Sequence, residues 1–396
     1  GWTPDWDNFD RRPTWYHNML SVVQSGQCVT SNQIDFDEEV AFNSVRKINE
    51  LARSDDERPF FLLASFTHPH DPFAITQEYW DRYDHDEIDM PKIPQIDYEK
   101  LDPHCKRLYH VSAMGEYEQT KERILNARHA YYSEISYADD KVGCLVSALE
   151  KNGLKDDTII VITSDHGEML GERGMWYKMS YFEWASRVPM IIRAPGRFSP
   201  RRVNQPVSLV DFLPTLTDIA CGGKPVEYAD SIDGKSLFPL LNGEDEDEKA
   251  LVYGEILCEG AISPIVMLRN GRYKYIYCDV DPEQLYDLDN DPDEINNLAG
   301  QKEYEELRKT FYDQVTKKWD TKVLREQIVA NQNRRRLVDR SMRKGRFTPW
   351  DFQPFEDASK KYMRNHLDLN ALERKARFPS PKIPEPDGRL GKRQEG

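Results

Sequence analysis

Residues 159–178, IIVITSDHGEMLGERGMWYK, are the stretch around which this 396-residue chain is organised. The β-branched run at its start predicts a strand that is buried on both faces. That strand ends in Asp165-His166-Gly167, and ligands bind at the carboxyl ends of strands in open α/β sheets. Asp165 offers an oxygen ligand, His166 offers a nitrogen ligand, and Gly167 lets the backbone turn close to an ion. The pattern fits a metal site and fits a helix cap with a loop histidine equally well, because Asp-His-Gly is a short motif.

A second apolar run, PFFLLASF at residues 59–66, predicts another buried strand. It ends in THPHDP, so His68 and His70 follow a strand end. Two histidines two residues apart face the same side if the backbone stays extended, which the intervening proline favours. The alternative is a proline-rich turn that carries surface histidines.

The remaining periodicity of the first 245 residues predicts an α/β domain with a mostly parallel sheet flanked by helices. We expect helices at 37–53, 120–151 and 207–220 and a strand at 188–195, with Gly153 as a C-cap candidate. A strand, a helix and a second strand imply a right-handed crossover and a parallel pair. Residues 73–118 lack periodicity and are interpreted as a long irregular segment, rich in aromatic residues, that forms a substrate wall.

The pattern changes after an acidic link at residues 242–250. Runs with a period of two follow it, and Asn270-Gly271 between two of them is a strong hairpin signal. We therefore expect a small antiparallel sheet, covered on one face by a helix at 302–319. The predicted domains are an α/β domain at 1–245, this α+β subdomain at 246–321, and a tail at 322–396. The tail is expected to dock as a subunit contact or an active-site cover, with a frayed terminus as the alternative.

Composition excludes several classes of protein. The formal net charge of −15 argues against nucleic acid as the main partner. The six cysteines form no CxxC pair, which favours a reducing, cytoplasmic compartment over a disulfide framework. No window approaches the roughly 18 apolar residues of a membrane span, so we expect no membrane partner.

Taken together, the motifs resemble the sulfatase branch of the alkaline-phosphatase superfamily, and most closely its choline-sulfatase subgroup. The resemblance covers nearly the whole chain and rests on the order and spacing of four segments. These are PFFLLASFTHPHDP, TSDHGEMLGERGMWYKMSYFEWASRVPMII, RNGRYKYIY with EQLYDLDNDPDEINNLA, and TPWDFQPFEDASKKYMRNH. The fold implied is the sulfatase-like α/β fold, and the activity implied is the hydrolysis of a sulfuric ester.

The resemblance also implies roles for individual residues. Asp165 and His166 would be metal ligands, with Ca²⁺ the expected ion and Mg²⁺ or Mn²⁺ as alternatives. His70 and Lys178 would be catalytic residues that hold sulfate oxygens and stabilise the charge that develops as the S–O bond breaks. From the residues alone, Lys178 lies beyond a Gly-rich turn and could reach back toward the metal to bind an anion, with a solvated surface lysine as the alternative.

The substrate implied is choline-O-sulfate, whose quaternary ammonium needs an aromatic surface and a carboxylate. By resemblance Glu255 is the candidate carboxylate, and Trp15, His17, Trp350 and Phe352 are candidate walls. A homodimer or homotetramer built through the tail is expected on the same grounds.

The nucleophile of the family is a formylglycine made from the first residue of a Cys/Ser-x-Pro/Ala-x-Arg motif. No cysteine of the chain begins such a motif, and no N-terminal apolar strand ends in paired aspartates. We therefore expect a C-terminal piece of a sulfatase that does not turn over substrate alone. The alternatives are a phosphonate monoester or phosphodiester hydrolase of the same superfamily, and a non-catalytic binding protein that has lost its nucleophile.

Overall fold

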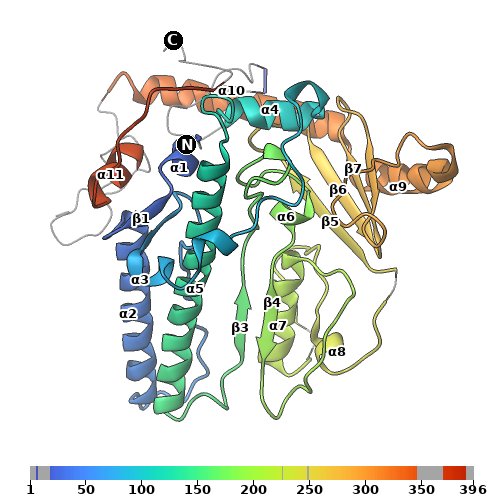
Figure 1. Ribbon diagram of the computed structural model, residues 1–396. Coiled ribbons are helices and arrows are strands. Elements are labelled where there is room, and N and C mark those ends of the chain that lie inside the picture. Colours follow the sequence, from blue (N-terminus) through green and yellow to red (C-terminus); the bar gives the residue numbers. More distant parts are fainter. Residues whose placement is uncertain (1–5, 8–17, 225, 248, 346–368, 389–396) are drawn as a thin grey trace.

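The computed structural model describes residues 6–7, 18–224, 226–247, 249–345 and 369–388 (Figure 1). Two long helices, α2 (Asn32–Ala52) and α5 (Lys121–Lys151), lie side by side at one side of the molecule. The Thr120 side chain caps α5 by accepting the backbone N–H of Arg123, and Gly153 follows its C-terminus with φ +71°. The predicted helix at 120–151 and its glycine C-cap are thus confirmed.

Helix α2 begins five residues before the predicted start at residue 37. Ser31 is its N-cap, because the Ser31 hydroxyl accepts the backbone N–H of Ile34. Asp37, which marks the expected start, lies inside the helix and is fully buried. The acidic residue was mistaken for a helix start because its buried partners lie far away in the sequence.

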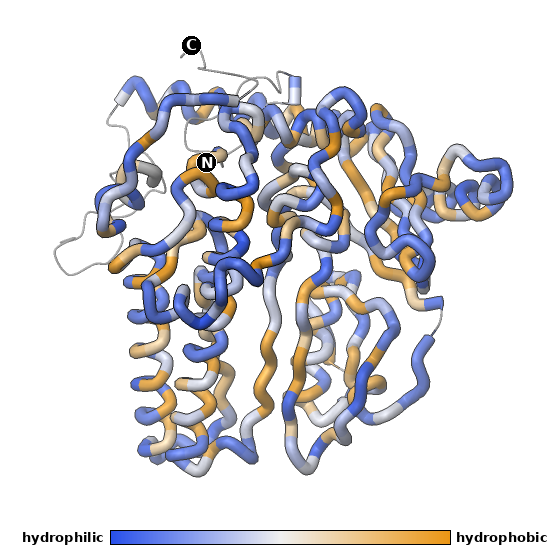
Figure 2. The backbone as a smooth tube through the Cα atoms, viewed as in Figure 1, coloured by the Kyte–Doolittle hydropathy of each residue, from blue (hydrophilic) through white to orange (hydrophobic). Residues whose placement is uncertain are grey.

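The α/β fold class is confirmed, but the strand at 59–66 is not. Strand β3 (Ile160–Thr163) pairs antiparallel with β4 (Met190–Arg193), and the two form adjacent hydrophobic stretches in Figure 2. Residues 59–66 form no assigned strand, and Phe61 and Leu63 are 72% and 74% exposed. Within the described residues this segment has no ladder to β3, and β3 itself is only partly buried. An apolar run reports only its own polarity, whereas its burial depends on neighbours that lie elsewhere in the chain.

The parallel pairing in the described part of the chain lies elsewhere, between β1 and β2. Strand β1 (Gly26–Cys28) pairs with β2 (Ala74–Thr76), next to the short helices α1 (Leu20–Val23) and α3 (Gln77–Trp80). Residues 73–118 are therefore less irregular than expected. They also include helix α4 (Pro103–Val111), which has Asp102 as N-cap and proline in its first turn.

The remaining elements of the first part of the chain are short helices around β4. Helix α6 (Glu183–Ser186) precedes that strand, and α7 (Phe212–Cys221) and α8 (Phe238–Leu241) follow it. The predicted helix at 207–220 is confirmed in α7, which ends at Gly222 with φ +63°. Leu213 of this helix is 56% exposed.

The predicted antiparallel sheet is confirmed, with the strand order β5 (Leu251–Ile256), β6 (Ile265–Asn270), β7 (Tyr273–Tyr277) and β8 (Gln284–Asp287). The hairpin at Asn270-Gly271 joins β6 to β7, with Asn270 opposite Tyr273. Helix α9 (Glu305–Lys318) covers one face through Phe311 and Val315, also as predicted.

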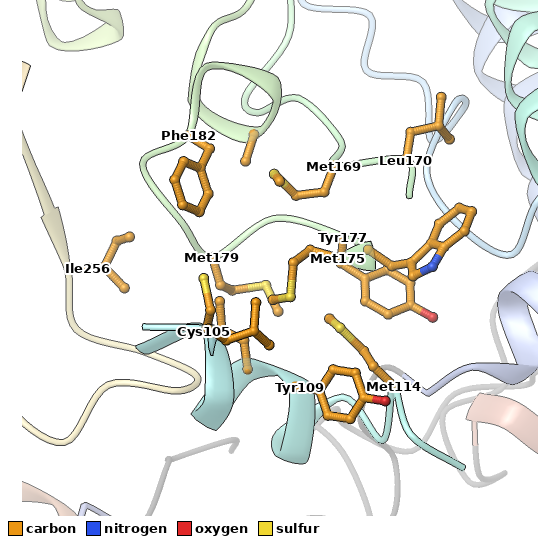
Figure 3. Close-up of a cluster of buried hydrophobic side chains, with 14 of the residues drawn as sticks. Cys105, Tyr109, Met114, Met169, Leu170, Met175, Tyr177, Met179, Phe182 and Ile256 are labelled. Atoms are coloured by element: carbon orange, nitrogen blue, oxygen red, sulfur yellow. The ribbon is translucent and has the colours of Figure 1, made fainter. Parts of the chain in front are cut away.

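The other face of this sheet packs on the main hydrophobic core, which Figure 3 shows at close range. Side chains of α4 and of the loop that follows β3 meet here, including Cys105, Met169, Met175, Tyr177 and Met179. The loop that begins with the Asp-His-Gly turn is therefore part of the core on which the antiparallel sheet packs.

Among the last described segments, α10 lies along the top of the molecule in Figure 1 and α11 lies at its left side. Helix α10 (Thr321–Met342) was not predicted from its Arg- and Lys-rich sequence, and α11 (Leu369–Ala376) follows after the undescribed residues 346–368. Beyond α11, the Phe378 carbonyl accepts the backbone N–H of Val29, and the Asp387 carboxylate binds the Arg123 guanidinium at 2.9 Å. These contacts tie residues 377–388 to the body of the same chain. The role of the tail in oligomers and the domain boundaries remain predictions.

The six cysteines are all unpaired thiols. Among the helices that the structure describes, none has the length and apolar character needed to cross a membrane.

Candidate functional site

The Asp165-His166-Gly167 turn is held against α6 by backbone hydrogen bonds. The Gly167 N–H donates to the Ala185 carbonyl at 2.8 Å, and the Glu168 N–H donates to the Trp184 carbonyl at 2.9 Å. A Cβ atom on Gly167 would lie 2.1 Å from the Trp184 oxygen. The backbone of the turn can approach α6 this closely only because residue 167 is a glycine.

We predict that Gly167→Ala lowers stability and displaces the turn. The added methyl group overlaps a backbone oxygen, and overpacking of this kind costs about 1–3 kcal/mol. Gly143→Ala is the matched control, because Gly143 lies within α5 and a methyl group added there would meet nothing within 4 Å. That substitution should raise stability by about 0.5–1 kcal/mol. Urea unfolding of both variants checks the pair, and a Gly167→Ala protein as stable as the wild type would contradict the close approach.

Lys178 is the partly exposed residue in a loop that is otherwise buried. All residues from 169 to 180 except Lys178 are buried. The residues on either side of the lysine, Tyr177 and Met179, have left-handed backbone conformations with φ of +70° and +64°. Such conformations are costly for residues other than glycine and cluster at functional sites. The loop thus holds one basic side chain at the surface of a packed core.

His70 lies opposite this lysine, with its Nε2 atom 2.5 Å from the Lys178 Nζ. Its Nδ1 atom lies 2.7 Å from the Asp71 carbonyl and 3.1 Å from the Asp71 carboxylate. An ammonium group can only donate, so Nε2 is the acceptor and the His70 proton is on Nδ1. The lysine and the histidine that the sequence predicts for the site are therefore adjacent in space.

His68 faces the other way, which corrects the expectation that the two histidines share a side. Its Nδ1 lies 2.7 Å from the Asp37 carboxylate, which also accepts the backbone N–H groups of Thr67 and His68. The His68 side chain is fully buried against α2. Because the backbone turns at THPHDP, the period of two that the prediction assumed does not hold there.

The candidate metal ligands lie beside His70. The His166 and His70 ring centroids are 5.9 Å apart, and the His166 Nε2 is 3.6 Å from the Asp165 carboxylate. Burial, and then the charge of Lys178, lower the pKa of His166 below its usual value. A neutral imidazole is the form that binds a metal, and the Asp165 side chain is 85% exposed, with its carboxylate accepting the His166 backbone N–H at 3.0 Å.

Two residues supply fewer ligands than a divalent ion requires. Ca²⁺ takes six to eight oxygen ligands, and the described residues contain no cluster of three or more His, Cys, Asp or Glu side chains that could hold a metal. Asp165 and His166 therefore fit part of a metal site, and the described residues do not complete it.

The site opens into a cavity of about 2170 Å³. His70, Lys178, Asp165 and His166 all line it, and Glu255 of β5 lines it as well. The Glu255 carboxylate accepts the indole N–H of Trp319 at 2.6 Å. Four residues predicted for the sulfate and metal positions and one predicted for the alcohol position thus face a single cavity.

Sequence reasoning missed several polar residues that line the same cavity. Asp71 is buried and accepts the Ser21 hydroxyl at 2.9 Å. Glu259 is 4% exposed, and burial raises the pKa of its carboxyl to about 7. The Tyr181 hydroxyl is buried without a hydrogen-bond partner among the described residues. Asp71 could have been found from its place beside His70, whereas Glu259 sits in a turn after β5 that carries no recognisable motif.

Glu168, which directly follows the Asp-His-Gly turn, was also missed. Its carboxylate accepts the backbone N–H groups of Leu170 and Tyr177. Burial, and then the charge of Asp71, raise the pKa of the Glu168 carboxyl to about 7. The predicted aromatic walls, Trp15, His17, Trp350 and Phe352, lie outside the described residues.

Comparison with known families and proteins shows which family the chain belongs to. The family described as Sulfatase matches residues 6–223, more than half of the chain. The chain belongs to the sulfatase family. Two further families extend the match: "N-sulphoglucosamine sulphohydrolase, C-terminal" covers residues 171–321, and "Choline sulfatase enzyme C terminal" covers residues 326–378.

Individual sulfatases give the same result. The chain is 40% identical over 387 residues to the choline-sulfatase of Rhizobium meliloti, a match that covers 96% of this chain and 75% of that protein. It is 33% identical to arylsulfatase K of Gallus gallus, over 61% of this chain and 48% of the relative. This sulfatase chain thus spans three quarters of the first relative and about half of the second.

Solved structures share the fold. The phosphonate monoester hydrolase of Agrobacterium radiobacter superposes with a TM-score of 0.60 at 25% identity, over 74% of this chain and 63% of that one. The sulfatase-like protein yidJ of Bacteroides fragilis gives 0.55 at 25% identity, over 70% and 57%. The resemblance to the sulfatase fold inferred from the sequence motifs is therefore confirmed.

Proposed function

We propose that this chain forms the sulfate- and alcohol-binding part of a sulfuric ester hydrolase that acts on choline-O-sulfate. The observation that carries the proposal is that Lys178 and His70 lie together beside His166, and that these three residues and Asp165 line one cavity. The choline-sulfatase of Rhizobium meliloti, at 40% identity, supports the choice of substrate.

Lys178 and His70 would bind the sulfate group together. The Lys178 ammonium has three donors, and one of them is shared with the His70 Nε2 at 2.5 Å. An arriving sulfate offers the lysine stronger, charge-assisted acceptors than a neutral imidazole. Lys178 then turns toward the sulfate, and a protonated His70 can donate to another sulfate oxygen, with its Nδ1–H still held by Asp71. Both groups aim positive charge at oxygens whose charge grows as the S–O bond breaks.

Asp165 and His166 would hold a divalent ion together with ligands from outside the described residues. We propose Ca²⁺, with Mg²⁺ or Mn²⁺ as alternatives, because the expected ligand set is mostly oxygen. A bound ion supplies Lewis-acid polarisation of the sulfate oxygens. The nucleophile of the complete enzyme would be formylglycine, for which the present sequence has no Cys/Ser-x-Pro/Ala-x-Arg motif.

Glu255 and Glu259 would bind the cationic end of the substrate. A quaternary ammonium has no N–H to donate, so it needs negative charge and surface contact instead of an acceptor of fixed geometry. Both glutamates line the cavity, and Glu259 is deeply buried within it. A buried carboxylate that forms no ion pair with a described basic group favours a cationic ligand, because the ligand compensates a charge that is costly to desolvate.

We predict that choline binds more tightly as the pH rises through 7. The pKa of Glu259 is raised to about 7, so its ionised fraction grows from roughly one tenth at pH 6 to roughly nine tenths at pH 8. If the ionised form binds, the dissociation constant of choline falls by up to about tenfold over this range. Isothermal titration calorimetry with choline chloride checks the prediction, and choline-O-sulfate should follow the same trend.

Two glutamine variants test the assignment of that pH dependence. Glu259→Gln should bind choline weakly and with no rise through pH 7, whereas Glu255→Gln should bind weakly and keep the rise. A pH dependence that survives in Glu259→Gln would remove Glu259 from the choline site. Choline that binds neither the wild type nor any variant would contradict the proposed substrate.

A second candidate is phosphonate monoester hydrolysis, which the fold match to the Agrobacterium radiobacter hydrolase favours. The two functions share the metal site and differ in the ester they accept. Affinity for choline-O-sulfate well above that for an uncharged aryl phosphonate ester supports the sulfatase assignment, and the reverse order supports the alternative.

A further inference from the structure

The position of Lys178 depends on how the peptide before it is held. Tyr177 has a left-handed backbone, and its side chain points into the main core together with that of Met179, as Figure 3 shows. The Tyr177 hydroxyl donates to the Asn18 carbonyl at 2.5 Å. The lysine therefore leaves the core between two anchored side chains.

Residues 168 and 169 hold both polar groups of the Tyr177 backbone. The Glu168 Oε1 accepts the Tyr177 backbone N–H at 2.5 Å, and the Met169 N–H donates to the Tyr177 carbonyl at 2.8 Å. The same Glu168 oxygen accepts the Leu170 N–H at 3.1 Å. Glu168 lies two residues after the candidate metal ligand His166. It thus closes the loop at the point where the chain reaches Lys178.

The Glu168 carboxylate provides the hydrogen-bond acceptor for the strained backbone at Tyr177. A left-handed tyrosine is maintained only when its surroundings over-determine it. A buried backbone N–H that loses its acceptor carries a desolvation cost, so the Tyr177 peptide would rotate to find another acceptor. Such a rotation moves the next residue, and Lys178 would leave the His70 Nε2.

We propose that Glu168 is a positioning residue that sets the Lys178 ammonium against His70 by accepting the Tyr177 N–H. The proposal rests on the proposed function in one respect, since the purpose of the placement is to grip sulfate. The placement itself is a property of this chain and can be measured without substrate.

Glu172 provides a matched control in the same loop. Its buried carboxylate accepts the backbone N–H groups of Lys92 and Ile93 at 3.0 and 2.8 Å. It therefore makes the same kind of backbone contact as Glu168, toward residues 92–93 instead of toward Lys178, and it also lies 3.5 Å from the Arg128 guanidinium. Removing either carboxylate leaves two backbone donors unpaired, but only Glu168 is bonded to the residue before the lysine.

The test follows the contact between Lys178 and His70 by NMR. Reductive ¹³C-methylation labels lysine amines, and Lys178→Arg assigns the Lys178 resonance. In the wild-type background His70→Gln should shift this resonance, because the two groups touch. The same shift should appear in Glu172→Ala and in Glu168→Gln, whose amide oxygen still accepts the Tyr177 N–H. In Glu168→Ala the effect of His70→Gln on the Lys178 resonance should vanish. Inorganic sulfate should also bind about tenfold more weakly to this variant.

Each outcome decides one point. A His70→Gln shift that persists in Glu168→Ala overturns the positioning role, as does its loss in Glu172→Ala to the same degree. If Glu168→Ala does not fold, Glu168→Asp takes its place: its carboxylate is one methylene shorter, and an unchanged shift in that variant overturns the proposal. Sulfate that leaves the wild-type Lys178 resonance unmoved contradicts the proposed function and leaves the positioning result standing.

Discussion

Lys178→Met is expected to lower sulfate-ester hydrolysis about 10²–10³-fold. The assay uses a protein in which this chain is joined to a segment that supplies the formylglycine nucleophile. Removing one preorganised donor from developing negative charge typically costs this much in kcat. The effect should be large here because Lys178 is the partly exposed cation of an otherwise buried loop and is held 2.5 Å from His70. The loss should fall mainly on kcat, since the charge on the sulfate oxygens grows toward the transition state.

A second lysine separates this effect from a general loss of positive charge. Lys155 forms an ion pair with Glu150 at 2.9 Å and does not line the cavity. Lys155→Met should leave hydrolysis unchanged, and its sulfate affinity, measured by calorimetry on the present chain, should match that of the wild type. Equal losses in both variants would contradict a specific sulfate contact at Lys178.

Lys274→Met is expected to lower the free energy of unfolding by about 3–5 kcal/mol, the usual result of removing one partner from a buried ion pair. Lys274 of β7 is 1% exposed and lies 2.7 Å from the carboxylates of both Glu183 and Glu294. It also donates to the Tyr181 carbonyl at 2.6 Å. Without it, Glu294 keeps a buried charge with little compensation, and the join between the C-terminal sheet and α6 is weakened.

Lys309→Met is the matched control for this prediction. Lys309 and Asp313 form an ion pair at the same 2.7 Å distance, but their side chains are 71% and 59% exposed on α9. An exposed pair at this spacing contributes about 0.3–0.5 kcal/mol. Urea unfolding followed by tryptophan fluorescence measures both variants, and similar losses in the two would show that burial does not set the strength of the Lys274 contacts.

The elements that the sequence predicted well are those governed by local chemistry. Thr120 and Gly153 bound α5, Gly222 ends α7, and Asn270-Gly271 turns the hairpin between β6 and β7. Caps and turns depend on residues within a few positions of one another, so their signals are complete in a short window. Helix α10 was missed because Arg and Lys dominate its sequence, although Leu324 and Ile328 lie four residues apart and pack against the cores and Asp320 caps the helix.

Residues whose role depends on distant partners could not be predicted in this way. Residues 59–66 look like a buried strand, yet Leu63 is 74% exposed. Glu259 is an ordinary glutamate in the sequence, and only its surroundings raise the pKa to about 7. Burial and electrostatics are sums over neighbours, and those neighbours come from other parts of the chain.

By itself, the sequence determined the α/β class, the antiparallel sheet with its covering helix, the family, and the candidate residues His70, Asp165, His166 and Lys178. Only the tertiary structure decided that His70 and Lys178 touch while His68 turns away to Asp37. It also decided that Glu168 holds the peptide before the lysine. The physical reason is that residue type sets what chemistry a side chain can perform, whereas the backbone turn and the packing around it set where that chemistry points.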